Sequence, residues 1–317
     1  MPQPRHAGLD RRHRTTGGRV ACRLLGLVSA GLVAWWVVLG VVGSSAASAG
    51  PPTPYYLAIG ASESLGVEPV ASHPQGRPTH QGYADDLVAT ERARWPGLSL
   101  VQVGCAGETA VAAVDGGGRC SYSAGSQLGA AVAFLRANPG ATVLATVDLG
   151  FNDVRACLAH RQVDHECMAD ALAGITRVLP GALAQLRSAG GPALQIVGLE
   201  HNDPFLAEEL DGPTGQAFAR DSETAVSQLN QTLDGIYTAA GAAVADVPRA
   251  FDLGDQRPVH LADIGTVPAE LAEMCELSWA CGPGPFTHNV HPNAAGYQAI
   301  AGAVAAAIPS KTSASVG

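Results

Sequence analysis

The chain has 317 residues and a formal net charge of -9. Nearly half of its residues are apolar and few are charged, so the chain can bury a sizeable core, and one α/β domain would account for most of it. Binding to nucleic acid needs clustered lysines and arginines, and no such cluster follows Arg23, which excludes that class of partner.

The first 49 residues have the pattern of an export signal. Arginines are frequent up to Arg23, residues 24–43 form an unbroken apolar run, and the Ala-Ser-Ala at residues 47–49 is a pattern that signal peptidases accept. The run also has about the 20 residues that span a bilayer, so a retained membrane anchor is the competing interpretation. Either way, the domain that follows is expected outside the cytoplasm, secreted or anchored to the membrane by residues 24–43.

Strand and helix patterns alternate between a Gly/Pro-rich linker at residues 50–54 and residue 309. Five short apolar runs predict strands, at residues 55–59, 99–103, 141–149, 193–199 and 242–247. Five longer patterns predict helices, at residues 85–94, 125–137, 168–188, 216–240 and 294–308. Pro180 is expected to kink or split the third helix. The alternation predicts one α/β domain at residues 55–309, with a mainly parallel sheet and helices on both faces, followed by a flexible tail at residues 310–317.

Six cysteines follow the single cysteine of the leader, and an even number in an exported chain indicates disulfides. They form three couples that are close in sequence. The simplest pairing is Cys105–Cys120, Cys157–Cys167 and Cys275–Cys281, although the sequence leaves other connectivities open. The Cys/His spacing of a zinc site is absent, so we expect no metal.

Four short motifs lie after predicted strands or before the last helix. The first strand leads to Ser62 in Gly-Ala-Ser, and the second leads to Gly107 in Ala-Gly-Glu-Thr. The third strand leads to Asn152 in Gly-Phe-Asn-Asp, and His291 in His-Pro-Asn precedes the closing helix. In open parallel sheets, ligands bind at the carboxyl ends of the strands, so we expect these side chains at one site.

In this order, the motifs resemble those of the GDSL/SGNH hydrolases, especially exported actinobacterial esterases and lipases. The resemblance covers residues 56–300 and implies a three-layer α/β/α sandwich that hydrolyses carboxylic esters. The resemblance implies that Ser62 is the nucleophile and His291 its base. It also implies that the N–H groups of Ser62 and Gly107 and the side chain of Asn152 form the oxyanion hole. The chemistry agrees, because a serine hydroxyl needs a base that takes its proton, and the pKa of histidine lies near neutrality.

The sequence departs from this family at two places. Ala61 stands where the family has aspartate, and Glu63 stands where it usually has an apolar residue. Asn289 and His288 occupy the positions where the family usually carries the third member of the triad. One hypothesis is a Ser-His dyad assisted by a backbone carbonyl or by a distant carboxylate such as Asp263. The alternatives are an impaired relative that binds an acyl chain or a glycan, and an O-deacetylase of cell-wall sugars.

The remaining polar residues are expected to have structural roles. Asp153 is expected to cap the helix after the third strand, and His201, His260 and His288 are expected at the surface or the rim of the site. We expect no cofactor. The expected partner is an ester substrate, either a lipid, a small ester or an acylated glycan. The expected state is a monomer whose N-terminal segment can associate with a membrane.

Overall fold

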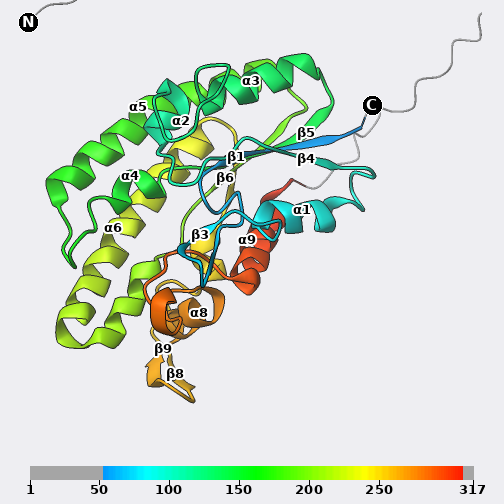
Figure 1. Cartoon of the computed structure of the whole chain (residues 1–317). Helices are drawn as coiled ribbons and strands as arrows, with labels where there is room; N and C mark the ends of the chain where they lie inside the picture. Colours follow the sequence, from blue (N-terminus) through cyan, green and yellow to red (C-terminus); the bar gives the residue numbers. More distant parts are fainter. Residues whose placement is uncertain (1–52, 310–317) are drawn as a thin grey trace, which may run out of the picture. The chain divides into compact units, whose positions relative to one another are not determined.

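Five parallel strands form the sheet at the centre of the domain (Figure 1). They are β1 (Tyr55–Gly60), β4 (Ser99–Gln102), β5 (Thr142–Asp148), β6 (Gln195–Leu199) and β7 (Ala243–Ala245). Their order in the sheet is β4-β1-β5-β6-β7, and every neighbouring pair is parallel. All five predicted strands are confirmed in this computed structural model, which describes residues 53–309. The predicted export segment and the predicted tail lie outside the described residues.

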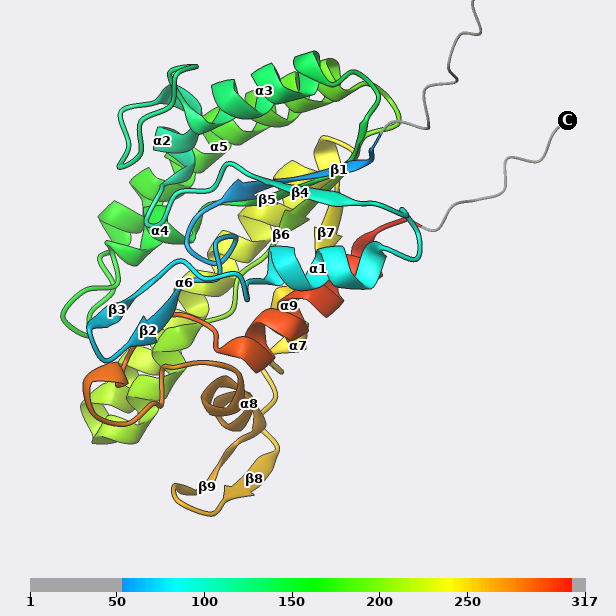
Figure 2. The ribbon, with the colours of Figure 1, turned by 45° about the vertical axis from the view of Figure 1, so that its right-hand side comes forward.

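Helices cover both faces of the sheet (Figure 2). One layer is formed by α2 (Ala110–Asp115), α3 (Gln127–Ala137), α5 (His165–Gly190) and α6 (Gly212–Ala239). The other layer contains α1 (Tyr83–Glu91), α7 (Val247–Ala250), α8 (Ala269–Leu277) and α9 (Ala294–Ala307). Strand β1 shows why two layers form, because Leu57 and Ile59 face the first layer while Tyr56 and Ala58 face the second. The predicted three-layer α/β/α class is confirmed.

Helix α5 runs through Pro180 as a single helix, so the expectation that this proline splits the pattern was wrong. A proline removes the hydrogen bond to the carbonyl four residues earlier, which here belongs to Thr176. Both residues are exposed, so this carbonyl can bind water instead. The opposite face of α5 buries Ile175, Leu179 and Leu183 against the sheet, which holds the two halves in line. By length and composition alone α5 could also cross a membrane.

Several elements form where the sequence shows no regular pattern. Two hairpins project from the domain, β2 (Glu68–Val70) with β3 (His73–Arg77), and β8 (Pro258–Leu261) with β9 (Gly265–Pro268). Short helical turns complete the described part, namely α4 (Phe151–Arg155), η1 (Pro204–Asp211) and η2 (Gly284–Phe286). The β2–β3 hairpin and η2 lie on the side of the domain that carries the predicted motifs (Figure 2).

Three disulfides link cysteines that are close in sequence, in the pairing that the sequence order suggests. They join Cys105 to Cys120, Cys157 to Cys167 and Cys275 to Cys281. The first closes the loop after β4, the second ties α4 to the start of α5, and the third closes the end of α8. Loops this short gain roughly 2–3 kcal/mol each in the chain-entropy model. The cross-links therefore fix loops at the edge of the sheet more than they fix the core.

The packing of α6 on β6 can be tested at Gly198. A Cβ added there would lie 2.3 Å from ring atoms of Tyr237, which is fully buried and donates a hydrogen bond to the carbonyl of Val147. Gly198→Ala should therefore lower the free energy of unfolding by about 1–3 kcal/mol in urea denaturation. The control is Gly235→Ala on α6, where a Cβ meets open space and should add roughly 0.5–1 kcal/mol. Equal stability of both variants would contradict this packing.

Candidate active site

The turn that carries Ser62 is held by hydrogen bonds from two directions. The buried Gln127 side chain accepts from the N–H of Gly60 at 2.8 Å and donates to its carbonyl at 3.0 Å. On the other side, the backbone carbonyl of Asp148 accepts from the N–H of Ala61 at 3.2 Å, and its carboxylate accepts from the N–H of Ser64 at 3.0 Å. The residues on both sides of Ser62 are therefore fixed to the end of β5.

Gly60 allows this close approach of β1 to β5. A Cβ at this position would lie 2.8–3.0 Å from atoms of Asp148, so any other residue would push the two strands apart. Beyond Gly60, Ser62 is half-buried. Within residues 53–309 its hydroxyl has no hydrogen-bond partner, which leaves it available to a substrate in the adjoining pocket.

The loops that carry Gly107 and Asn152 are tied to each other. The side-chain amide of Asn152 donates to the carbonyl of Glu108 at 3.1 Å, which leaves its second N–H unused. Asp153 accepts from the N–H of Ala110 at 2.7 Å and so caps α2. The expectation that Asp153 caps the helix of its own loop was wrong, because α4 begins one residue after Gly150 and leaves Asp153 facing α2. Gly107 adopts a φ of +77°, which favours glycine.

His291 is oriented by a neutral side chain. Its Nδ1 lies 2.8 Å from Oδ1 of Asn289, and the same oxygen accepts the N–H of His291 at 3.0 Å. The amide group of Asn289 donates in turn to the carbonyl of Pro74 on β3 at 2.8 Å. An amide oxygen can only accept, so it fixes the proton on Nδ1 and leaves Nε2 as the basic nitrogen.

This contact differs from both forms of the dyad hypothesis. The partner of His291 is the carbonyl of the Asn289 side chain, where we expected a backbone carbonyl or Asp263. Asp263 is exposed in the turn between β8 and β9 and takes no part in the site. Burial of His291, and then the charge of Arg155, lower its pKa to about 4, so the imidazole is neutral at physiological pH.

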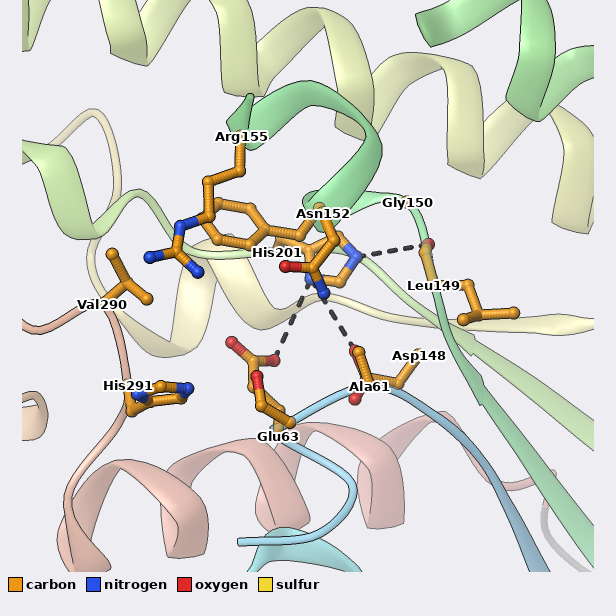
Figure 3. A pocket seen from close by; sticks show the side chains of 12 residues that line it. Ala61, Glu63, Asp148, Leu149, Gly150, Asn152, Arg155, His201, Val290 and His291 are labelled. Atoms are coloured by element: carbon orange, nitrogen blue, oxygen red, sulfur yellow. Dashed lines mark hydrogen bonds and ion pairs between the residues drawn. The ribbon is translucent and has the colours of Figure 1, made fainter. Parts of the chain in front are cut away.

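The structure brings the four predicted residues to one edge of the sheet. Ser62, Asn152 and His291 line a small inner pocket of about 10 Å³ together with Arg155 (Figure 3). Ser62 and His291 also line an open groove of about 500 Å³, to which Gly107 contributes. The β2–β3 hairpin and the segment after η2 form the outer wall of this groove.

Two carboxylates and a histidine lie buried beneath the inner pocket (Figure 3). Nδ1 of His201 is 3.9 Å from Oε2 of Glu63 and 3.9 Å from Oδ1 of Asp148. Burial raises the pKa of Asp148 to about 7, and burial followed by the charge of Asp148 raises the pKa of Glu63 well above its usual range. Burial also lowers the pKa of His201 to about 4. At neutral pH the pair of carboxylates therefore retains a proton beside a neutral imidazole.

Sequence reasoning missed this cluster. His201 is only 2% exposed, so placing it at the surface or the rim was wrong. The one available signal was Glu63, a charged residue at a position that is usually apolar in the family. The ligating atoms of Glu63, Asp148 and His201 lie within 4.8 Å of one another, close enough to surround a small cation, although a retained proton already offsets the charge.

Comparison with known proteins identifies the family. Residues 58–299 match the GDSL-like Lipase/Acylhydrolase family, and the chain belongs to it. A lipase from a goat rumen metagenome is 16% identical, with 80% of this chain and 97% of that chain covered and a TM-score of 0.50, a likeness that concerns the fold. An extracellular lipase from Streptomyces rimosus is 19% identical, with coverage of 80% and 99% and a TM-score of 0.49. No curated protein matches the chain.

The buried carboxylates predict a dependence of stability on pH. In the folded state the Glu63–Asp148 pair retains a proton above the pH, roughly 4, at which unfolded carboxyl groups lose theirs. Unfolding then releases that proton, so the free energy of unfolding should fall as the pH rises from about 4 through the folded pKa of about 7. Glu63→Gln should make this decline shallower between pH 5 and pH 8, because the contribution of Glu63 is lost while that of Asp148 remains, as measured by urea denaturation. Exposed Glu276→Gln is the control, and a decline in Glu63→Gln as steep as in the wild type would rule out the retained proton.

The contact between His291 and Asn289 predicts how the histidine titrates. NMR of the ring protons should give His291 a pKa of about 4. Asn289→Asp places a negative charge on Nδ1–H and should raise this pKa by roughly 1–3 pH units. If the pKa of His291 did not move, the hydrogen bond to position 289 would be refuted.

Proposed function

We propose that this member of the GDSL-like lipase/acylhydrolase family is an exported serine esterase, with Ser62 as nucleophile and His291 as base. The observation that supports it best is the shared pocket, in which a hydroxyl without a partner and an imidazole with a free Nε2 line the same walls. A nucleophile and a base within one small pocket are what ester hydrolysis by serine requires. The family supports acyl hydrolysis, and the assignment of roles to residues is our inference.

In the proposed reaction, Nε2 of His291 takes the proton of the Ser62 hydroxyl while Oγ attacks the ester carbonyl carbon. The carbonyl oxygen gains the electron pair of the broken π bond and becomes an oxyanion. The N–H groups of Ser62 and Gly107 and the unused N–H of Asn152 are the proposed donors to it. The imidazolium then protonates the leaving alkoxide, which departs as the alcohol. Water, activated by the same base, hydrolyses the acyl-enzyme and restores Ser62.

The neutral partner of His291 limits this chemistry. Asn289 fixes the tautomer as an aspartate would, but it adds no negative charge beside the imidazolium that forms during attack. The low pKa of His291 also limits the reaction, because a weak base gives less driving force for removal of the serine proton. We therefore expect modest turnover at neutral pH, with the base fully deprotonated.

The volumes on either side of Ser62 favour a short acyl group. The inner pocket of about 10 Å³ holds little more than one water molecule, whereas the groove is about fifty times larger. The first space leaves no room for an acyl group longer than acetyl, and the alcohol portion of the ester then occupies the second. This observation favours the second candidate function, an O-deacetylase acting on a large polar alcohol such as a sugar, over a lipase for long acyl chains.

The proposed location is outside the cytoplasm. Three disulfides in residues 53–309 are stable in an oxidising compartment and rare in the cytosol. The basic and apolar leader gives the same indication from sequence alone. We propose an exported monomer, with residues 24–43 as a signal or an anchor.

The proposal predicts a specific loss of activity. Ser62→Ala should reduce hydrolysis of 4-nitrophenyl acetate to background and abolish labelling by a fluorophosphonate probe, as followed by mass spectrometry. Asn152→Ala should lower kcat by roughly 10²–10³, because one donor to the oxyanion is lost. Ser72→Ala, on an exposed serine in the β2–β3 turn, is the control and should behave as the wild type. Full activity of a folded Ser62→Ala protein would overturn the assignment.

A further inference from the structure

The groove beside Ser62 carries positive charge that its walls do not neutralise. Arg119, Arg155 and His288 contribute to its lining, and among residues 53–309 no aspartate or glutamate does. Nδ1 of His288 lies 3.2 Å from a carboxylate oxygen of Glu208, which places that ring beside an acid outside the groove. The two arginines therefore account for the charge that faces a ligand.

Arg119 lies directly against the proposed oxyanion loop. A Cβ added to Gly107 would lie 2.7 Å from a terminal nitrogen of Arg119 and 3.2 Å from its Cδ. The adjacent Cys120 is joined to Cys105, which holds the loop closed. Glu108 is 2% exposed, and its carboxylate accepts the backbone N–H of Arg119 and interacts with the charge of its guanidinium. Burial raises the pKa of Glu108, which weakens it further as a counter-charge for the guanidinium.

Arg155 reaches the site from α4. It lies one turn after Asn152 on α4, and its guanidinium extends into the pocket near Val290 and His291 (Figure 3). Its charge contributes to the lowered pKa of His291, and the charge of Arg119, after burial, lowers the pKa of Arg155 itself. The two guanidinium groups are thus close enough to repel each other.

Neither arginine forms a salt bridge with an acid among residues 53–309, although the buried Glu108 carboxylate interacts with the charge of Arg119. Two other arginines of the described surface do form such salt bridges. Arg161 lies 2.7 Å from Glu208, and Arg177 lies 3.1 Å from Asp115. The chain has a net charge of -9, yet two arginines without a salt bridge face one groove. A bound anion would offset the repulsion between their guanidinium groups.

We infer that Arg119 and Arg155 form a subsite for an anionic group, a phosphate or a carboxylate, on the alcohol portion of the ester. Guanidinium groups match the planar or tetrahedral oxygens of such anions with paired hydrogen bonds. The alcohol portion is the one concerned, because the inner pocket has room only for a short acyl group and the groove takes the rest. This inference rests on the proposed function and narrows it to esters of acidic alcohols.

Two acetate esters with the same chromophore provide the kinetic test. They are the neutral ester 4-nitrophenyl acetate and the anionic ester 3-carboxy-4-nitrophenyl acetate. To correct for intrinsic reactivity, each kcat/KM is divided by the rate constant for hydrolysis of that ester by hydroxide. The wild type should prefer the carboxylated ester by roughly tenfold or more, as one charge-assisted contact provides. In Arg119→Gln/Arg155→Gln this preference should fall to about one. The ratio of the two kcat/KM values cancels any effect of the substitutions on the chemical steps that both esters share. The control is Arg177→Gln, at a surface arginine paired with Asp115, which should keep the preference.

A binding measurement without turnover separates this inference from the proposed function. Ser62→Ala should bind 5-hydroxy-2-nitrobenzoate roughly tenfold more tightly than 4-nitrophenol at pH 5.5, where the carboxylate is ionised and both phenols are protonated. Adding the two arginine substitutions should abolish the difference. Equal binding of the two compounds would overturn the anionic subsite, even if neutral acetate is hydrolysed through Ser62. Preferential binding without any hydrolysis would support the subsite and refute the esterase.

Discussion

The site depends on the way Asp148 ends strand β5. Its backbone carbonyl accepts the N–H of Ala61 and its carboxylate accepts the N–H of Ser64, so one residue holds the chain before and after Ser62. A carboxylate that accepts a backbone hydrogen bond is normally stabilised in its charged form, yet burial raises the pKa of Asp148 to about 7. The turn is therefore fixed by an acid that is costly to ionise, and the buried carboxyl group of Glu63 lies close to it.

Asp148 also explains why the turn is ordered although Ala61 and Glu63 depart from the family motif. Ala61 cannot provide the hydrogen bonds of an aspartate, but the backbone around it is already held by Asp148 from the next strand. Glu63 returns a carboxylate to the turn two residues later, pointing towards His201 (Figure 3). The turn thus carries its carboxylate at position 63 and not at position 61. Asp148 on β5 and His201 after β6 lie beside it.

The strands, the layers and the cluster of four motifs follow from local patterns, and these could be predicted from the sequence. Apolar runs specify buried strands, and parallel strands place their carboxyl ends together, so Ser62 and Asn152 meet whatever the details of the loops. The contacts that tune the site are long-range. Arg119 reaches Gly107 because a disulfide closes the loop, and His201 meets Glu63 from a strand more than a hundred residues away. Asn289 was identified as the position of interest, but only the fold shows that its side chain, rather than a backbone carbonyl, faces His291.

The disulfide between Cys105 and Cys120 has a consequence for when the site becomes complete. It closes the loop that presents Gly107 and carries Arg119, whereas the turn around Ser62 is held by hydrogen bonds to Gln127 and Asp148 that need no oxidation. In a reducing compartment the turn around Ser62 would keep these hydrogen bonds while the segment between β4 and α3 lacked its cross-link. The order of the proposed oxyanion loop is thereby coupled to the redox state of the compartment.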